Sequence, residues 1–338
     1  MNNASKLDPV LFIGGSGVVG RRAVKALRDL QPHLPLRIGA RDVTKASALA
    51  REVGNADAVR IDLERDDLGL PPGSTFSAIV VLLKDDSLRT MRYAQDQGVP
   101  YVSFSDFVFD IGPEVALHVQ RPTAAPTLFL GHFLGGTVAL ATLHFARELA
   151  KVHAIRISAV FDEEDVGGPA ALGDMDRVAK GVPSPLIRKE GRFLWATSEA
   201  DITRTFQGVD GTQWQGRAYP LLDVASLAAV TDASDIRLDF ALRPASRRAP
   251  GQGPGHEVII ELEGVKADGT PSLVRHALVD ADVHSGLSGK GAALAVERLL
   301  GLTGGAPVKP GLYSPEGVLD AAYVVSRLQE WGTRIHRG

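Results

Sequence analysis

The sequence predicts an α/β fold: a doubly wound parallel sheet with an inserted α+β domain built on a mostly antiparallel or mixed sheet. Three observations predict it. A short apolar strand at residues 10–13 passes through a glycine turn into a helix. Strands and amphipathic helices then alternate as far as residue 150. From residue 154 the chain is rich in strands and poor in helices, which indicates a second domain.

The first strand, Val10–Ile13, leads into glycines with the G-x-G-x-x-G spacing. Gly15 permits the tight turn, Gly17 lets the backbone approach a pyrophosphate, and Gly20 lets the helix pack closely on the strand. The helix N-terminus adds free N–H groups and a partial positive charge for phosphates. An ordinary strand-to-helix turn can share this spacing, but its position favours a Rossmann-type dinucleotide site. The expected cofactor contacts are Gly15, Ser16, Gly17, Val18, Val19 and Gly20.

The end of the second strand, Leu36–Ala40, indicates which dinucleotide is bound. A chain that prefers NAD usually has Asp or Glu there, which accepts a hydrogen bond from the ribose 2′-hydroxyl. Here Arg41 follows the strand, and its guanidinium suits a bidentate contact with a 2′-phosphate. A solvated Arg41, or an Asp42 that reaches the ribose, remains the alternative. We expect NADP(H) in preference to NAD(H).

Four later strands are expected to end beside the same ligand, because open α/β sheets bind ligands beyond the carboxyl ends of their strands. They are predicted at residues 58–63, 77–83, 99–104 and 127–130. The residues placed to border the adenine, or to meet the cofactor or substrate elsewhere, are Asp62, Leu63, Leu83, Lys84, Ser103 and Asp106. The alternative is that these residues cap the next turn or helix, which is the more common outcome for Asp62 and about as frequent for the others.

His132 is the candidate proton donor or substrate contact, and Asp106 is the second candidate catalytic residue. His132 lies in a glycine-flanked loop, Gly131–Gly136, just past a strand. The ordinary pKa of histidine suits proton transfer near neutral pH. The alternative is a histidine hydrogen-bonded to backbone in a tight loop. A long helix follows, with an apolar face formed by Val138, Ala141, Phe145 and Leu149.

The second half of the chain is expected to form the inserted sheet. Its strands are predicted at residues 154–161, 192–196, 202–207, 236–242, 256–265 and 272–280. Lys266–Gly269 is a hairpin turn between the last two. Open sheet edges lead us to expect a homodimer. The expected organisation is a nucleotide-binding domain, a substrate and dimerisation domain, and C-terminal helices that return to the first domain, at residues 1–133, 134–285 and 286–338.

Composition excludes several other classes of protein. The 338 residues carry a net charge of −3, with no feature of a nucleic-acid or membrane-surface binder. The absence of cysteine excludes disulfides and thiolate chemistry. The nine histidines lack H-x-x-x-H spacing, so no metal is expected. Without a signal peptide or an apolar run of membrane-spanning length, a cytoplasmic location and a small-molecule substrate are expected.

The order of these elements resembles the saccharopine dehydrogenase-like family of NAD(P)-binding oxidoreductases. The similarity spans nearly the whole chain, with the glycine motif as its sharpest part. Two departures stand out: this chain has His132-Phe-Leu-Gly135 where the family commonly has Asp-Pro-Gly, and Ser103 where the family has Asp. The matching stretches are residues 13–20, 38–42, 218–223, 262–278 and 311–318.

The resemblance implies an NADPH-dependent oxidoreductase that transfers hydride to or from a small imine or secondary amine, often derived from an amino acid. An iminium carbon is already electrophilic, so the main task of the protein is to position it against the nicotinamide. The Tyr-x-x-x-Lys pair of short-chain reductases is missing. A carboxylate on the substrate would be held by an arginine of the strand-rich domain, for which the candidates are Arg188, Arg192, Arg204 and Arg217.

A second hypothesis is a non-catalytic protein that binds NADP(H) as a redox sensor and contacts a partner through its sheet domain. The apolar character of the loop at residues 132–136 keeps this hypothesis open. Reduction of an activated C=C bond is a variant of the first hypothesis. Both hypotheses predict cofactor binding, and they differ on turnover.

Overall fold

The computed structural model divides into two compact units, which we describe separately. The first unit comprises residues 1–135 and 288–319, and the second comprises residues 136–287 and 320–338. The structure describes residues 7–105, 107, 110–165, 167–168, 172–173, 176, 180, 184–248, 253–280 and 282–338.

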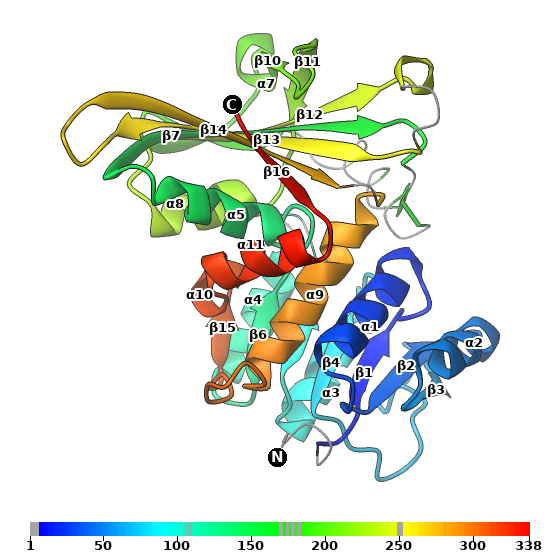
Figure 1. Ribbon diagram of the computed structural model, residues 1–338. Helices are drawn as coiled ribbons and strands as arrows, with labels where there is room; N and C mark the ends of the chain where they lie inside the picture. Colours follow the sequence, from blue (N-terminus) through cyan, green and yellow to red (C-terminus); the bar gives the residue numbers. More distant parts are fainter. Residues whose placement is uncertain are drawn as a thin grey trace. The chain divides into compact units, whose positions relative to one another are not determined.

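The described part of the first unit contains a seven-stranded sheet in the order β15-β6-β5-β4-β1-β2-β3 (Figure 1). Every neighbouring pair in it is parallel. The carboxyl ends of all seven strands therefore lie at one edge, where ligands of such sheets bind. The strands are β1 Val10–Ile13, β2 Leu36–Ala40, β3 Ala56–Arg60, β4 Ala78–Val81, β5 Tyr101–Ser103, β6 Pro126–Phe129 and β15 Gly311–Tyr313.

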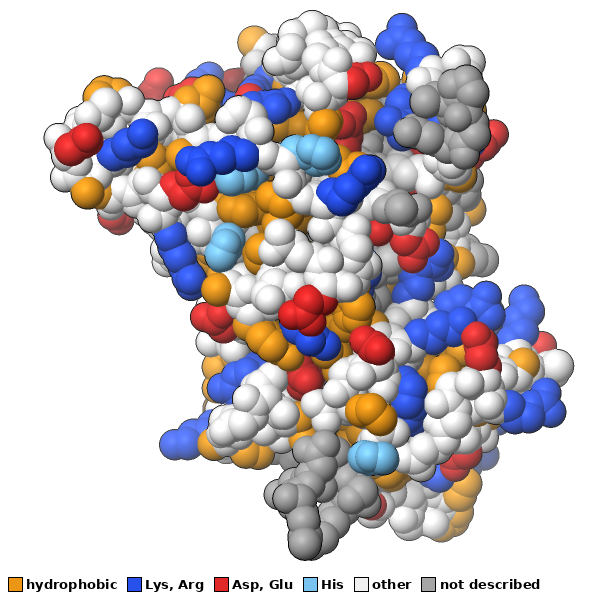
Figure 2. All heavy atoms as spheres, viewed as in Figure 1, with side chains coloured by type: hydrophobic (Ala, Val, Ile, Leu, Met, Phe, Trp, Pro, Cys, Tyr) orange, Lys and Arg blue, Asp and Glu red, His pale blue; other side chains and the backbone are white. Residues whose placement is uncertain are grey.

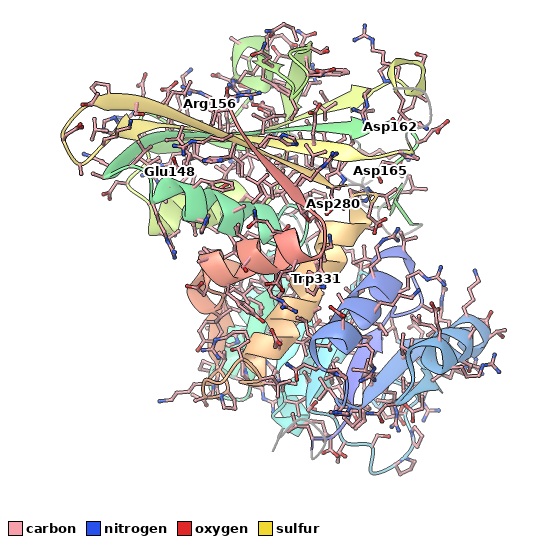
Figure 3. All side chains as sticks on the ribbon, viewed as in Figure 1. Glu148, Arg156, Asp162, Asp165, Asp280 and Trp331 are labelled. Atoms are coloured by element: carbon pink, nitrogen blue, oxygen red, sulfur yellow. The ribbon has the colours of Figure 1, made fainter. Side chains whose placement is uncertain are left out.

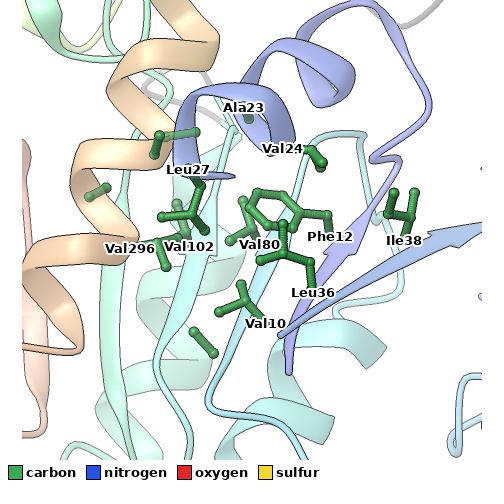
Figure 4. Packing of buried hydrophobic residues seen from close by; sticks show 14 of the residues in the cluster. Val10, Phe12, Ala23, Val24, Leu27, Leu36, Ile38, Val80, Val102 and Val296 are labelled. Carbon is green, nitrogen blue, oxygen red and sulfur yellow. The ribbon is translucent and has the colours of Figure 1, made fainter. Parts of the chain in front are cut away.

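Helices cover both faces of this sheet, because alternate strand residues point to opposite sides. Val10 and Phe12 pack with side chains of α1, α2 and α9 on one face (Figure 4). Leu11 and Ile13 pack with Met91 of α3 on the other face. The helices of this unit are α1 Val18–Leu30, α2 Val43–Val53, α3 Arg89–Gln97, α4 Ile111–Gln120, α10 Pro315–Val318 and most of α9 Ser285–Leu299.

The second unit is built on a mixed sheet in the order β10-β11-β12-β7-β13-β14-β16, with β8 and β9 branching from β12. Strands β7 and β12 are parallel, and the other described pairs are antiparallel. The strands are β7 Lys151–Asp162, β8 Leu186–Lys189, β9 Arg192–Trp195, β10 Thr203–Gln207, β11 Gln213–Ala218, β12 Asp235–Arg243, β13 His256–Val265, β14 Pro271–Asp280 and β16 Arg334–Arg337.

The end of the chain belongs to this second unit, which corrects the expectation that all of residues 286–338 return to the first domain. Residues 288–319 group with the first unit, but residues 320–338 do not. Helix α11 packs on α5 through its buried apolar face. Strand β16, which follows α11, pairs with β14. The helices are α5 Thr137–Ala146, α7 Glu199–Ile202, α8 Asp223–Val230 and α11 Ala321–Glu330, with the 3₁₀ turn η2 at Ala245–Arg247.

The predicted fold class is confirmed: a parallel, doubly wound sheet and a mixed second sheet. Strands β1, β2 and β13 have the predicted bounds. The hairpin turn at Lys266–Gly269 is also present, with Gly269 at a φ of 82°. The described elements that were not predicted from the sequence are α4, β8, α7, β11, α8, η2, β15, α10 and β16.

Candidate cofactor site

The glycine turn between β1 and α1 is shaped by contacts that leave no room for a side chain. The positive φ of the tight turn lies at Gly14, at 80°. A Cβ on Gly15 would lie 2.8 Å from the Cβ of Phe12. A Cβ on Gly20 would lie 2.3 Å from the carbonyl oxygen of Gly14. The turn and the first turn of α1 are therefore in backbone contact.

The N-terminus of α1 has the properties of a phosphate site. Gly17 is the N-cap and has no side-chain cap, and the first turn contains no acidic residue. Gly17 is exposed and Ser16, Val18 and Val19 are partly exposed, so an anion can reach the backbone N–H groups of this turn. A Cβ on Gly17 would lie 3.1 Å from the Gly14 oxygen. The residues at this turn fit a pyrophosphate.

Arg41 and Asp42 follow β2 and have different surroundings. Arg41 is exposed and makes no hydrogen bond or ion pair to another described residue. The Asp42 carboxylate accepts a hydrogen bond from the Thr44 N–H at 2.9 Å, as the N-cap of α2. Figure 2 shows basic side chains on the surface formed by α1 and α2. Asp42 thus caps a helix, and the guanidinium of Arg41 is available to an anion.

Asp62, in the turn after β3, is held by hydrogen bonds with backbone groups of that turn. Asp62 Oδ1 accepts from the Glu64 N–H at 3.0 Å, and the Asp62 N–H donates to the Leu68 oxygen at 2.9 Å. Asp62 therefore caps the turn, the alternative weighed for this residue. Leu63 beside it is partly buried and packs on the core of the α3 face.

The carboxyl ends of β4 and β5 bring together several predicted residues. Leu83 packs on the core of the α3 face, and Lys84 Nζ forms an ion pair with Asp110 Oδ1 at 2.5 Å. Ser103, the last residue of β5, is buried. Asp106 lies outside the described residues, so its predicted role remains untested.

Glu114 of α4 is a residue of this edge that the sequence did not reveal. It is only 3% exposed, and its Oε1 accepts hydrogen bonds from Ser103 Oγ at 2.6 Å and from Ser105 Oγ at 3.2 Å. Burial raises the pKa of Glu114 to about 7, while the serine hydrogen bonds oppose that rise. Its position shortly after the predicted strand at residues 99–104 is the one signal in the sequence. The glycine and proline at positions 112 and 113 are not typical of a helix, so the helix that carries Glu114 was not predicted.

His132 is buried, and its surroundings change the role expected of it. Both ring nitrogens are enclosed, and the backbone of Phe129 is a hydrogen-bond partner that favours the charged ring. Burial lowers the pKa of His132 to about 3, so the imidazole is neutral at physiological pH. Desolvation disfavours the charged ring more than the Phe129 hydrogen bond favours it, and the role of His132 as proton donor or substrate contact stays a prediction.

The loop that contains His132 is held against α9 by glycines. A Cβ on Gly135 would lie 2.7 Å from the Ser288 oxygen, and a Cβ on Gly291 would lie 2.2 Å from the Gly135 oxygen. The same helix meets α1, because a Cβ on Gly289 would lie 2.6 Å from the Cβ of Arg22. Helix α9 thus supports both the helix after the glycine turn and the loop after β6.

The arginines expected to hold a substrate carboxylate are distributed over the second unit. Arg204 is partly buried, where its guanidinium pairs with Glu261 and donates to Ser158 Oγ at 3.0 Å. Arg217 is exposed, and Arg192 lies in the exposed strand β9. Arg204 is opposite Gly216 in the β10–β11 register, so the side chains of Arg204 and Arg217 point to opposite faces. These two arginines cannot bind one carboxylate together.

A separate group of charges lies at the end of β7, where Figure 3 shows Asp162 and Asp165. Arg248 donates two hydrogen bonds of 2.8 Å to Asp162. His284 donates its backbone N–H and faces Asp165 with Nδ1 at 2.7 Å. Burial alone would raise the pKa of Asp165, but the histidine contacts lower it below its usual range. These carboxylates are ionised and paired.

Among the residues that the structure describes, no cluster of three or more His, Asp or Glu side chains could hold a metal ion. None of the described helices has the length and apolar character needed to cross a membrane.

Comparisons with known proteins give the fold. No family model matches the chain, and no curated protein does. Apo saccharopine dehydrogenase (L-Glu forming) from Saccharomyces cerevisiae is 12% identical, with coverage of 98% of this chain and 100% of that one and a TM-score of 0.69. A myo-inositol dehydrogenase from Corynebacterium glutamicum is 14% identical, with 98% of both chains covered and a TM-score of 0.47. A meso-dapdh variant from Clostridium tetani is 13% identical, with 96% and 99% covered and a TM-score of 0.47.

The likeness to the yeast saccharopine dehydrogenase extends over both units of this chain. The resemblance inferred from the sequence is therefore confirmed at the level of the fold. The other two likenesses have TM-scores below 0.5, and we draw nothing from them.

Proposed function

We propose that this chain is an NADP(H)-dependent oxidoreductase that transfers hydride to or from a small imine or secondary amine. The observation that carries the proposal is the cradle at the start of α1. Gly15, Gly17 and Gly20 have no side chain that would cover the backbone, and the N-terminus of α1 has no side-chain cap. The likeness to a saccharopine dehydrogenase that is named as L-Glu forming supports a substrate derived from an amino acid.

The preference for NADP(H) rests on Arg41. Its guanidinium is exposed and unpaired among the described residues, directly after β2. Asp42, the nearest carboxylate in the chain, is engaged as a helix cap. A 2′-phosphate therefore has a cationic partner there, whereas a 2′-hydroxyl lacks the carboxylate that usually accepts from it.

The cofactor supplies hydride chemistry when bound. The residues of this chain have the simpler tasks of binding phosphates and orienting the ligands. The neutral His132 can exchange a hydrogen bond but is not an acid near neutral pH. An iminium substrate suits such a site, because its reduction needs hydride without a proton donor.

The test is a comparison of coenzyme affinities by calorimetry. Wild-type protein is expected to bind NADPH more tightly than NADH. Arg41→Ala should weaken NADPH binding by about 10- to 100-fold, since a charge-assisted hydrogen bond contributes roughly 1.5–3 kcal/mol, and should leave NADH binding nearly unchanged.

Arg51→Ala is the matched control, because Arg51 is an exposed arginine at the far end of α2. It should leave both affinities unchanged. A wild-type protein that binds neither nucleotide contradicts the proposed function. Equal weakening of both nucleotides by Arg41→Ala contradicts the cofactor preference alone.

One observation favours the second candidate, a non-catalytic NADP(H)-binding sensor. The loop after β6 is buried throughout residues 131–136, with Phe133 and Leu134 each 6% exposed. Such a loop offers few polar groups to a substrate. Tight binding of NADPH, combined with no oxidation of it by a panel of cyclic imines and of 2-oxo acids with amino acids, would favour the sensor.

A further inference from the structure

The carboxyl group of Glu114 has an environment that the proposed hydride transfer does not use. Its Oε1 is held by the hydroxyls of Ser103 and Ser105, and its Oε2 is buried without a partner among the described residues. Lys84, which follows β4, pairs with Asp110 and forms no ion pair with Glu114. A carboxylate in this place would be a buried negative charge without a counter-ion among the described residues, which is costly.

The other charged groups around Glu114 add to this cost. Asp110, just before α4, and Asp85, after β4, both disfavour a negative charge on Glu114. Tyr101 of β5, whose hydroxyl lies 3.0 Å from Thr90 Oγ1, is uncharged because burial raises its pKa. No described cation pairs with Glu114. Burial and the two acids together raise its pKa to about 7, so the protonated form predominates below about pH 7.

The position of Glu114 in the fold indicates which cationic group of a ligand could bind near it. Ser103 is aligned with Val81 of β4 and with Phe129 of β6, so Glu114 is bonded to the carboxyl edge of the middle strand of this half-sheet. A doubly wound sheet binds one nucleotide over each half. Arg41 at the end of β2 marks the adenosine half. The β4–β6 half is then the nicotinamide half, and this ring carries a positive charge only when oxidised.

We propose that Glu114 is a proton-linked counter-charge that discriminates the oxidation state of the nicotinamide. Glu114 gives up its proton when the oxidised, cationic ring binds and keeps it when the reduced, neutral ring binds. The bond broken is the O–H of the carboxyl group, and the proton passes to the buffer with no change in oxidation state. This inference rests on the proposed function, because it requires a nicotinamide cofactor at this edge.

Two measurable consequences follow. Near pH 6.5, binding of NADP⁺ should release about one half to three quarters of a proton more than binding of NADPH, because the 2′-phosphate, whose pKa is about 6, contributes equally in both nucleotides. The affinity for NADP⁺ should also rise with pH, by up to about tenfold per unit below the pKa of Glu114, and then level off. The affinity for NADPH should not follow this trend.

The experiment is calorimetric titration of the full-length protein with NADP⁺ and with NADPH, each in PIPES and in imidazole, which buffer near pH 6.5 and contain no phosphate. The difference in heat between buffers of different ionisation enthalpy gives the number of protons released. Glu114→Gln should reduce the release on NADP⁺ binding to that measured with NADPH and remove the difference in pH dependence between the two nucleotides. Glu257→Gln is the matched control, because Glu257 is a buried glutamate of the second unit whose pKa burial also raises, and it should keep the wild-type release.

A second variant covers the case in which Glu114→Gln does not fold. Ser105→Ala removes one hydrogen bond to the carboxyl group, so it should move the pH dependence of NADP⁺ affinity to higher pH. Two results overturn the inference and leave the proposed function standing. One is equal proton release with both nucleotides, and the other is an excess release with NADP⁺ over NADPH that persists in Glu114→Gln. Failure of the wild-type protein to bind either nucleotide overturns both.

Discussion

Gly20 illustrates how one residue without a side chain fixes the geometry of the candidate site. It occupies the first turn of α1, where any Cβ would collide with the Gly14 oxygen and with the backbone of Gly15. The contact is between backbone atoms, so no rotamer change can relieve it. The direction of the helix N-terminus, and with it the place for a phosphate, depends on this contact.

Replacement of Gly20 should therefore disturb both stability and binding. We expect Gly20→Ala to lower the free energy of unfolding by about 1–3 kcal/mol, as overpacking does, and to weaken NADPH binding. Thermal unfolding and calorimetry measure the two effects. Gly112→Ala is the control, because a Cβ at Gly112 meets no atom within 4 Å. Wild-type behaviour of Gly20→Ala would contradict the role of this contact.

At the scale of elements, helices α9 and α11 show how late segments of the chain complete earlier ones. Helix α9 supplies Ala292, Val296 and Leu299 to the core that also contains the strands of the first unit. Helix α11 supplies Val324, Val325 and Leu328, which are buried in the second unit. Each unit is thus completed only when the last fifth of the chain is in place.

The burial of α11 predicts a large effect of one truncation. Leu328 is fully buried, and Leu328→Ala should cost about 2–5 kcal/mol of stability through lost burial and the cavity it leaves. Ser326 on the exposed side of the same helix is the control, and Ser326→Ala should change stability by less than about 0.5 kcal/mol. Chemical denaturation monitored by circular dichroism tests both. A loss below about 1 kcal/mol for Leu328→Ala would mean that α11 is not packed as described.

At the scale of the whole molecule, buried carboxyls give the two units opposite responses to pH. Burial raises the pKa of Glu114 in the first unit above its unfolded value. Its contribution to stability is fully present below pH 4.5 and is lost as the pH rises to about 7. In the second unit, the hydrogen bonds from Arg248 lower the pKa of Asp162. Its contribution is present above pH 3.8 and is lost as the pH falls further.

The two opposite pH dependences of stability can be measured separately with two variants. Relative to Glu114→Gln, the wild-type protein should lose up to about 3 kcal/mol of unfolding free energy between about pH 4.5 and 8. Relative to wild type, Asp162→Asn should be less stable at neutral pH, and this deficit should shrink below about pH 3.8. Urea unfolding across this pH range measures both differences. A difference that does not vary with pH in either variant would contradict the corresponding pKa shift.

The local features of this protein could be predicted from residues that are close together in the chain. Apolar runs of strand length, the glycine spacing and the position of Arg41 follow from neighbours within a few residues, so β1, β2, the glycine turn and the fold class could be predicted. The resemblance to saccharopine dehydrogenase-like proteins rested on the same local stretches and the order of the elements.

Tertiary structure alone decided the chemistry of the polar residues. Glu114 meets Ser103 and Ser105 only because α4 packs beside the end of β5, and desolvation there sets its pKa. His132 loses its charge for the same reason. A pKa depends on burial and on partners distant in the chain, and neither is encoded by spacing, whereas the strand and turn signals that located the cofactor site are local.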